Sequence, residues 1–155
     1  MTLPQLEDGV SPYNASVVID KPVAEVFRFV GTDYLENHPR WAPLVVEVRL
    51  DAPGVMAQGA RGQVVRKQGR KNVTYAFEVT DFQVDRRVAI RAEGGPGRYT
   101  SSYAMTPVGE TRTRLDVGFS LQMGGLFGLI RPFMGGVFRR EVARVAASIK
   151  ERVET

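Results

Sequence analysis

The stretch that decides the fold is FRREVARVAASIKERVE, residues 138–154, close to the C-terminus. Its apolar residues recur at steps of four, three, four and four, which places them on one stripe of an α-helix. They are Phe138, Val142, Val145, Ile149 and Val153. Arginine and lysine side chains mostly lie off this stripe. The pattern therefore predicts a long amphipathic helix that packs along an apolar surface elsewhere in the chain.

The segment before this stripe, GGLFGLIRPFMGG at 124–136, contains five glycines and one proline. In a helix interior each glycine costs about 1 kcal/mol relative to alanine, and a proline costs about 3 kcal/mol. We interpret the segment as a movable lid and hinge over a cavity mouth. Its hinge residues would be Gly124, Gly125, Gly128, Pro132, Gly135 and Gly136. The alternative is a long loop before a helix that begins near Pro132, where proline is tolerated in the first turn.

The surface for this helix is predicted to be an antiparallel sheet. Residues 13–20 alternate as a strand does, and residues 21–30 have helical spacing that ends at Gly31. A further helical turn and a loop should occupy 32–43. About six consecutive strands then follow, and in the last one Leu115, Val117 and Phe119 share one face. The sequence predicts an α+β domain in which a curved sheet holds one long helix.

Composition excludes several classes of site. The chain of 155 residues has no cysteine and one histidine, His38, so neither disulfides nor sites rich in cysteine or histidine can form. We predict no metal and no cofactor. The length predicts a single domain over residues 1–155, in which residues 1–12 form an extended lead. No apolar run is long enough to span a membrane, and the N-terminus lacks a signal-peptide pattern, which favours the cytoplasm.

The stretches VVIDKPVAEVFRFV, TRTRLDVGFSL and the terminal FRREVARVAASIKERVE, in this element order, resemble the START-like or SRPBCC superfamily. The branch they look most like is the polyketide cyclase/dehydrase and lipid-transport branch. The resemblance extends over about residues 13–154. It implies the helix-grip fold, in which a seven-stranded antiparallel sheet wraps a C-terminal helix around a mostly apolar cavity. It does not assign an activity, because members include lipid carriers, hormone receptors and aromatase/cyclases.

Strand parity and helix position indicate which side chains line such a cavity. Residues that share a strand face should point to the same side of the sheet. The candidates are Trp41, Tyr75, Phe77, Tyr99, Ser101, Tyr103, Phe119, Met123, Phe133, Val137 and Phe138. The alternative for each of them is an ordinary place in a filled core.

Catalytic groups are sparse. His38, in ENHPRWAP, precedes Pro39, which biases it away from helical geometry and toward an exposed loop. His38 and Tyr103 are the candidates for acid–base chemistry, but phenols near their usual pKa of about 10 are poor bases at neutral pH. The sequence therefore favours binding or transport of a small hydrophobic ligand (a lipid, polyketide or aromatic compound) without catalysis. The alternative is a polyketide cyclase/dehydratase-type enzyme that uses cavity tyrosine or histidine groups.

Charge indicates possible further partners. The formal net charge is +4, and the densest basic run is RKQGRKN at 66–72, which we interpret as a solvated hairpin turn. Aromatic residues are not interleaved with it on one face, so nucleic acid is not an expected partner. Arg131, Arg139 and Arg140 beside the apolar GLFGLIRPF make transient contact with an anionic membrane a possible delivery step. A third hypothesis is an interaction module whose sheet or lid binds a protein or a membrane surface.

Overall fold

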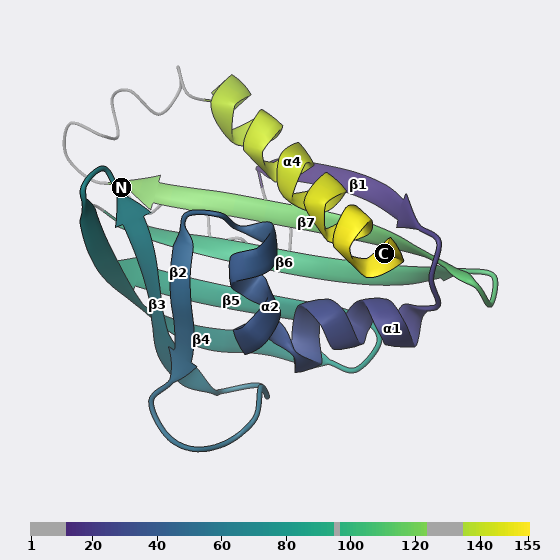
Figure 1. Cartoon of the computed structure of the whole chain (residues 1–155), viewed down its shortest axis with the longest axis horizontal. Helices are drawn as coiled ribbons and strands as arrows, with labels where there is room; N and C mark the ends of the chain where they lie inside the picture. Colours follow the sequence, from purple (N-terminus) through teal and green to yellow (C-terminus); the bar gives the residue numbers. More distant parts are fainter. Residues whose placement is uncertain (1–11, 95–96, 124–134) are drawn as a thin grey trace.

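The computed structural model describes residues 12–94, 97–123 and 135–155. Seven antiparallel strands form one sheet, short helices follow the first strand, and a long helix closes the chain (Figure 1). In order, the elements are β1 (Tyr13–Ile19), α1 (Val23–Phe27), the π-helix η2 (Arg28–Thr32), α2 (Tyr34–Trp41), β2 (Val45–Leu50), β3 (Arg61–Gln68), β4 (Lys71–Gln83), β5 (Arg87–Gly94), β6 (Gly97–Val108), β7 (Arg112–Met123) and α4 (Gly135–Glu154). The predicted α+β helix-grip architecture is confirmed.

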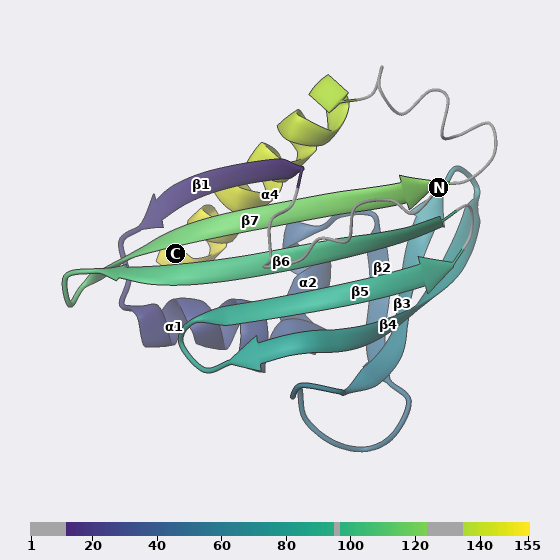
Figure 2. The same cartoon turned by 180° about the vertical axis from the view of Figure 1, so that it is seen from behind.

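The strands lie in the order β1-β7-β6-β5-β4-β3-β2, so the first two strands of the chain occupy opposite edges of the sheet. The middle strands follow one another as hairpins, as the sequence predicts. The β3–β4 pair joins Gln68 to Lys71 across its turn. Seen from behind, the sheet presents a face on which none of the described helices lies (Figure 2). The helices that the structure describes are therefore gathered on the other, concave face.

Helix α4 packs on this face with the predicted stripe. Val142 and Ile149 are buried and Phe138, Val145 and Val153 are partly buried. Ala146, which the sequence analysis did not include, is also fully buried and lets the helix approach the sheet closely. The helix contacts chiefly β1 and β7.

Polar contacts fix the C-terminal end of α4. The Lys150 ammonium donates to the Val18 carbonyl at 2.8 Å, and the Asp20 backbone N–H donates to the Glu154 carboxylate at 2.8 Å. Lys150 and Glu154 also pair with each other at 2.6 Å. These contacts tie the last turn of α4 to the end of β1.

The first helical region differs from the prediction. Gly31 does not end the helix, because the chain continues through the π-helical turn η2 into α2. A Cβ at Gly31 would lie 2.9 Å from a methyl of Val88 and 3.0 Å from the Phe27 ring. The glycine therefore permits close packing of this helical region against β5 instead of terminating it.

The predicted lid lies mostly outside the described residues. Gly124, Gly125, Gly128, Pro132 and Phe133 all fall in 124–134. Gly135 and Gly136 are described, and they are the first two residues of α4 as the structure gives it. The interior-glycine cost considered above therefore does not apply to this pair in the described part of the helix. Motion of the lid stays a prediction. None of the helices in the described ranges is long and apolar enough to cross a membrane.

One glycine is required by close packing within the sheet. A Cβ at Gly62 in β3 would lie 2.1 Å from the Arg49 carbonyl oxygen and 2.7 Å from the Phe77 ring. At Gly54, in the β2–β3 loop, an added Cβ would meet nothing within 4 Å. The two positions form a matched pair.

We predict that Gly62→Ala lowers the free energy of unfolding by about 1–3 kcal/mol, because a backbone atom and a packed ring must move. Gly54→Ala should change it by less than about 0.5 kcal/mol. Urea unfolding of both variants measures the difference. Equal stability of the two variants would contradict the packing described for β3.

Candidate ligand-binding cavity

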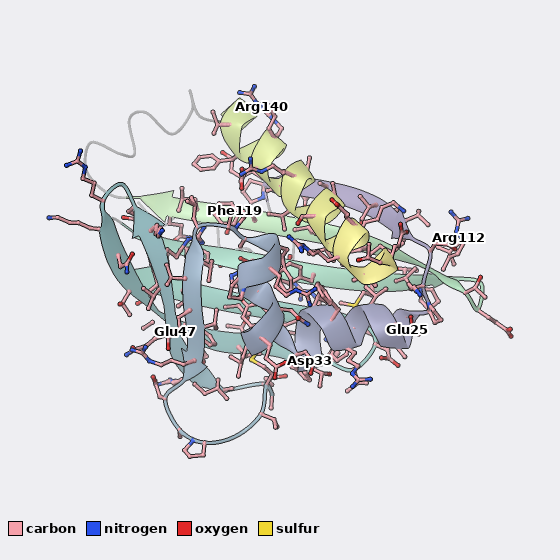
Figure 3. The ribbon with its side chains drawn as sticks, viewed as in Figure 1. Glu25, Asp33, Glu47, Arg112, Phe119 and Arg140 are labelled. Atoms are coloured by element: carbon pink, nitrogen blue, oxygen red, sulfur yellow. The ribbon has the colours of Figure 1, made fainter. Side chains whose placement is uncertain are left out.

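A cavity of about 190 Å³ lies between α4, the strands β3, β6 and β7, and the connection from α2 to β2. Its lining is predominantly apolar, with a few polar groups among the apolar ones. The α2 end contributes His38, Trp41, Ala42, Pro43 and Leu44; the sheet contributes Arg66, Ser101, Tyr103, Val117, Gly118 and Phe119; and α4 contributes Phe138, Glu141, Val142 and Val145. Figure 3 shows Phe119 on β7 in the region between α4 and β2.

Five residues that the sequence predicts for a cavity line this one, and they come from all sides of it. They are Trp41, Ser101, Tyr103, Phe119 and Phe138. Period-two alternation places the three strand residues on the concave face, and the helical stripe places Phe138 opposite them. Whether these side chains bind a ligand stays a prediction.

The other cavity candidates lie elsewhere. Tyr75, Phe77 and Tyr99 are buried but lie in the adjoining core. There the Tyr75 and Tyr99 rings are 5.6 Å apart, and Tyr99 packs against Phe119 at 5.7 Å. Val137 is 49% exposed. Successive residues of a helix point in different directions, so Val137 faces solvent where Phe138 faces the sheet. Met123 ends β7 with its side chain undescribed, and Phe133 lies outside the described residues.

The expectation of an exposed loop histidine is wrong. His38 is 6% exposed and lies within α2, which also contains Pro39. Its ring stacks on Tyr34 with centroids 4.6 Å apart and meets the edge of Trp41 at 5.2 Å. Tyr34, His38 and Trp41 follow the spacing i, i+4, i+7, so one face of α2 is aromatic and buried. Burial of that face outweighs the local bias that a following proline imposes.

Burial governs the protonation of His38. It lowers the pKa of the imidazole to about 3, and the nearby positive charge of Arg66 lowers it further in the same direction. His38 is therefore neutral at pH 7. Its Nδ1 atom is buried and has no hydrogen-bond partner among the described residues. The imidazole is thus poorly suited to proton transfer at neutral pH.

The phenols are also held in their neutral form. Burial raises the pKa of Tyr103 to about 12, partly offset by hydrogen-bonding interactions with Trp41 and Ser101. The indole Nε1 of Trp41 is buried near the Tyr103 hydroxyl and has no well-aligned hydrogen-bond partner in the part of the chain that the structure describes. Burial likewise raises the pKa of Tyr34 well above its usual value. At neutral pH these groups can donate hydrogen bonds but cannot accept protons.

Arg66 is the principal residue that sequence reasoning missed. It was assigned to the solvated basic turn, yet in β3 it shares the concave face with Val64 and lines the cavity. Its guanidinium carbon lies 5.4 Å from the centroid of the Tyr99 ring, a cation–π contact. The signal was available, because Gly62, Val64 and Arg66 have the same strand parity.

Glu141 was also missed, and it is the carboxylate of the lining. It lies on α4 with its side chain 51% exposed, and its two oxygens are 3.1 and 3.2 Å from Arg144 of the same helix. Glu141 therefore lies at the solvent side of the cavity with its charge already paired. Within the described ranges there is no group of three or more histidine, cysteine, aspartate or glutamate side chains that could hold a metal.

Comparison with protein families identifies the chain. The model for polyketide cyclase / dehydrase and lipid transport proteins matches residues 13–154. The chain belongs to this family. Its match runs from the first residue of β1 to the last residue of α4, so the whole helix-grip unit is included. No curated protein matches the chain.

Solved structures share the fold at low sequence identity. A START superfamily protein from Mycobacterium smegmatis has a TM-score of 0.74 at 13% identity, covering 91% of this chain and 95% of that one. The Zhui aromatase/cyclase from Streptomyces sp. R1128 has a TM-score of 0.68 at 17% identity, covering 91% and 92%. Norcoclaurine synthase from Thalictrum flavum has a TM-score of 0.63 at 12% identity, covering 90% and 84%. At these identities the matches establish the fold, and the family includes both carriers and enzymes by its own description.

The buried histidine generates a prediction about pH. The folded pKa of about 3 lies below the usual value of 6.5, so the neutral form is favoured by folding. Stability from this group is fully present above pH 6.5 and is lost as the pH falls toward 3. Between pH 8 and pH 5 the loss should be about 2 kcal/mol. The imidazole Cε1–H resonance should not titrate between pH 5 and 8, and urea unfolding at both pH values measures the stability.

His38→Phe is the matched control, because it keeps a ring against Tyr34 and removes the titrating group. Its stability should depend less on pH between 8 and 5 than that of the unchanged protein. An imidazole resonance that titrates with a midpoint near 6.5 would contradict the burial of His38.

Proposed function

We propose that the protein binds and carries a small hydrophobic ligand in the cavity between the sheet and α4. The observation that carries the proposal is the predominantly apolar hollow itself, which reaches solvent beside Leu44 and Glu141. Its volume of about 190 Å³ exceeds the roughly 150 Å³ of an engineered cavity that binds benzene. Aromatic rings with a few polar groups among them are the usual lining of a small-molecule site.

Family membership supports this proposal without naming a ligand. The family description includes lipid transport as well as polyketide cyclase and dehydrase activities. The ring groups lining the cavity are Trp41, Tyr103, Phe119 and Phe138, together with the neutral imidazole of His38. These surfaces suit a ligand with a flat apolar body.

The rim of the cavity also supports the predicted contact with a membrane as a delivery step. Leu44, which lines the cavity, is 54% exposed, and Val137 on the first turn of α4 is 49% exposed. Arg139 and Arg140 are exposed on the same turns of α4, and Figure 3 shows Arg140 at that end of the helix. Apolar and basic side chains together are typical of contact with an anionic lipid surface. This contact stays a prediction.

Occupancy of the cavity can be tested by filling it. We predict that Val145→Phe, on the cavity-facing stripe of α4, weakens binding of naphthalene-2-carboxamide at least about tenfold, because the new ring takes the ligand's volume. Ala143→Phe, on the exposed side of the same helix, should leave the affinity unchanged. Isothermal titration calorimetry measures both. The indole N–H resonance of Trp41, the single tryptophan, should shift on binding.

Two results would contradict the proposal. One is unchanged affinity in Val145→Phe. The other is an empty protein by native mass spectrometry after purification from its host, combined with no shift of the Trp41 resonance for aromatic or aliphatic test compounds.

The second candidate function is cyclisation and dehydration of a poly-β-ketone. The observation in its favour is that His38 and Tyr103 line the cavity together with Arg66. The pKa directions above mean that His38 and Tyr103 act here only as neutral groups. Tyr103 could donate a hydrogen bond to an enolate oxygen, and Arg66 could stabilise its charge. The proton removed from the substrate would have to go to a base other than His38 or Tyr103. Glu141 is the one carboxylate in the described lining.

Heptane-2,4,6-trione tests this candidate, since an aldol closure between its terminal methyl and the far ketone, followed by loss of one water, yields 5-methylresorcinol. The enzyme hypothesis predicts that this product forms faster with the protein than in buffer alone, and that the Tyr103→Phe variant loses most of this acceleration. Liquid chromatography with mass detection measures the product. If 5-methylresorcinol forms no faster with the protein than in buffer, the enzyme hypothesis is contradicted and binding without catalysis remains.

A further inference from the structure

We propose that the cavity selects a compact aromatic ligand that bears one anionic group, and that Arg66 binds this group. The proposal rests on the binding function above and deepens it by naming the ligand class. It depends on three features of the described residues. They are the placement of Arg66, the absence of a neutralising partner, and the size of the cavity.

The first feature is the placement of Arg66 on the concave face among aromatic rings. Arg66 is partly buried in β3 and lines the cavity together with Ser101 and Tyr103 of β6. Its charge acts on the ionisation of Tyr34, His38, Tyr99 and Tyr103, in each case beside the larger effect of burial. The positive charge of Arg66 therefore acts on each of these four aromatic side chains.

The second feature is that this charge is not neutralised. Most other arginines in the described ranges lie within 4.0 Å of a carboxylate, as Arg61 does with Glu78 and Arg87 with Asp81. No carboxylate of the described residues pairs with Arg66. Its neighbour across the cavity is Glu141, whose oxygens are on Arg144 instead.

A partly desolvated cation gains most from an anion that enters the same low-dielectric space. The neighbouring phenols cannot supply that anion, because burial keeps them protonated at neutral pH, and the imidazole of His38 carries no negative charge in either of its forms near neutral pH. The missing negative charge is therefore expected on the ligand. A carboxylate, or another small acidic group of planar shape, matches the donor fork of a guanidinium.

The third feature is size. An engineered cavity of about 150 Å³ accommodates benzene, and sites for drug-sized ligands are about 300–1,000 Å³. The present volume of about 190 Å³ fits one or two fused rings and a small substituent. It is too small for a lipid with two acyl chains. The apolar body of the ligand would lie against Phe119 and Phe138, with its acidic group toward Arg66.

The experiment compares two probes of nearly equal shape, naphthalene-2-carboxylate and naphthalene-2-carboxamide, by calorimetry at pH 7.5. The wild-type protein should bind the carboxylate at least about tenfold more tightly than the amide, the ratio expected for one charge-assisted hydrogen-bonded pair. In Arg66→Gln this preference should disappear, because the carboxylate loses at least about tenfold more affinity than the amide does. Measurable amide binding by this variant also shows that it is folded.

Two further variants separate charge at this position from charge in general. Lys67→Gln removes the adjacent positive charge, which points away from the concave face and is exposed, and it should keep the preference. Arg66→Lys keeps the charge but lacks the planar fork, so it should recover part of the preference.

The outcomes distinguish this inference from the function on which it rests. If the amide binds as tightly as the carboxylate, or if the preference survives in Arg66→Gln, the role of Arg66 is overturned while ligand binding stands. If Lys67→Gln loses the preference as Arg66→Gln does, the effect is one of overall charge and the inference is also overturned. If neither probe binds, ligand carriage for aromatic compounds of this size fails, and the inference fails with it.

Discussion

The contact between α4 and the concave face of the sheet is the constraint on which the rest of the structure depends. Val142, Ala146 and Ile149 bury this contact, and the C-terminal turn is tied to β1 by Lys150 and Glu154. A straight helix can match a curved sheet along only part of its length, because strands twist and coil. Contact is close where the helix is tied down. It is incomplete toward the other end, and the cavity lies there.

Electrostatics in the cavity follow from the same burial. Because His38 and Tyr103 are buried among apolar and aromatic side chains, both are held in their uncharged forms. Arg66 differs from them, since a guanidinium stays charged under all ordinary conditions. The described lining therefore combines hydrogen-bond donors with the positive charge of Arg66, and its carboxylate, Glu141, lies at the solvent side. The ionisable groups of this lining are therefore poorly suited to proton transfer at neutral pH.

Sequence reasoning succeeded where residue spacing decides the direction in which a side chain points. It failed where packing between distant segments decides that direction. The inward positions of Ser101, Tyr103 and Phe119 follow from strand alternation, which no neighbour can alter without changing the register. His38 was misplaced because its local preference beside a proline is weak, and burial of an aromatic helix face outweighs it. Arg66 was misplaced because a basic run near a turn suggests solvent, although its own parity pointed inward.

By itself the sequence determined the order of elements, the hairpin succession and the apolar stripe of the closing helix, because these depend on periodicities that are local to each segment. The tertiary structure alone decided which aromatic residues line the cavity and which fill the core beside it. That choice separates Tyr103 from Tyr75 and Tyr99, although all three face inward. It depends on where α2 and α4 lie over the sheet, and this is set by contacts between segments far apart in the chain.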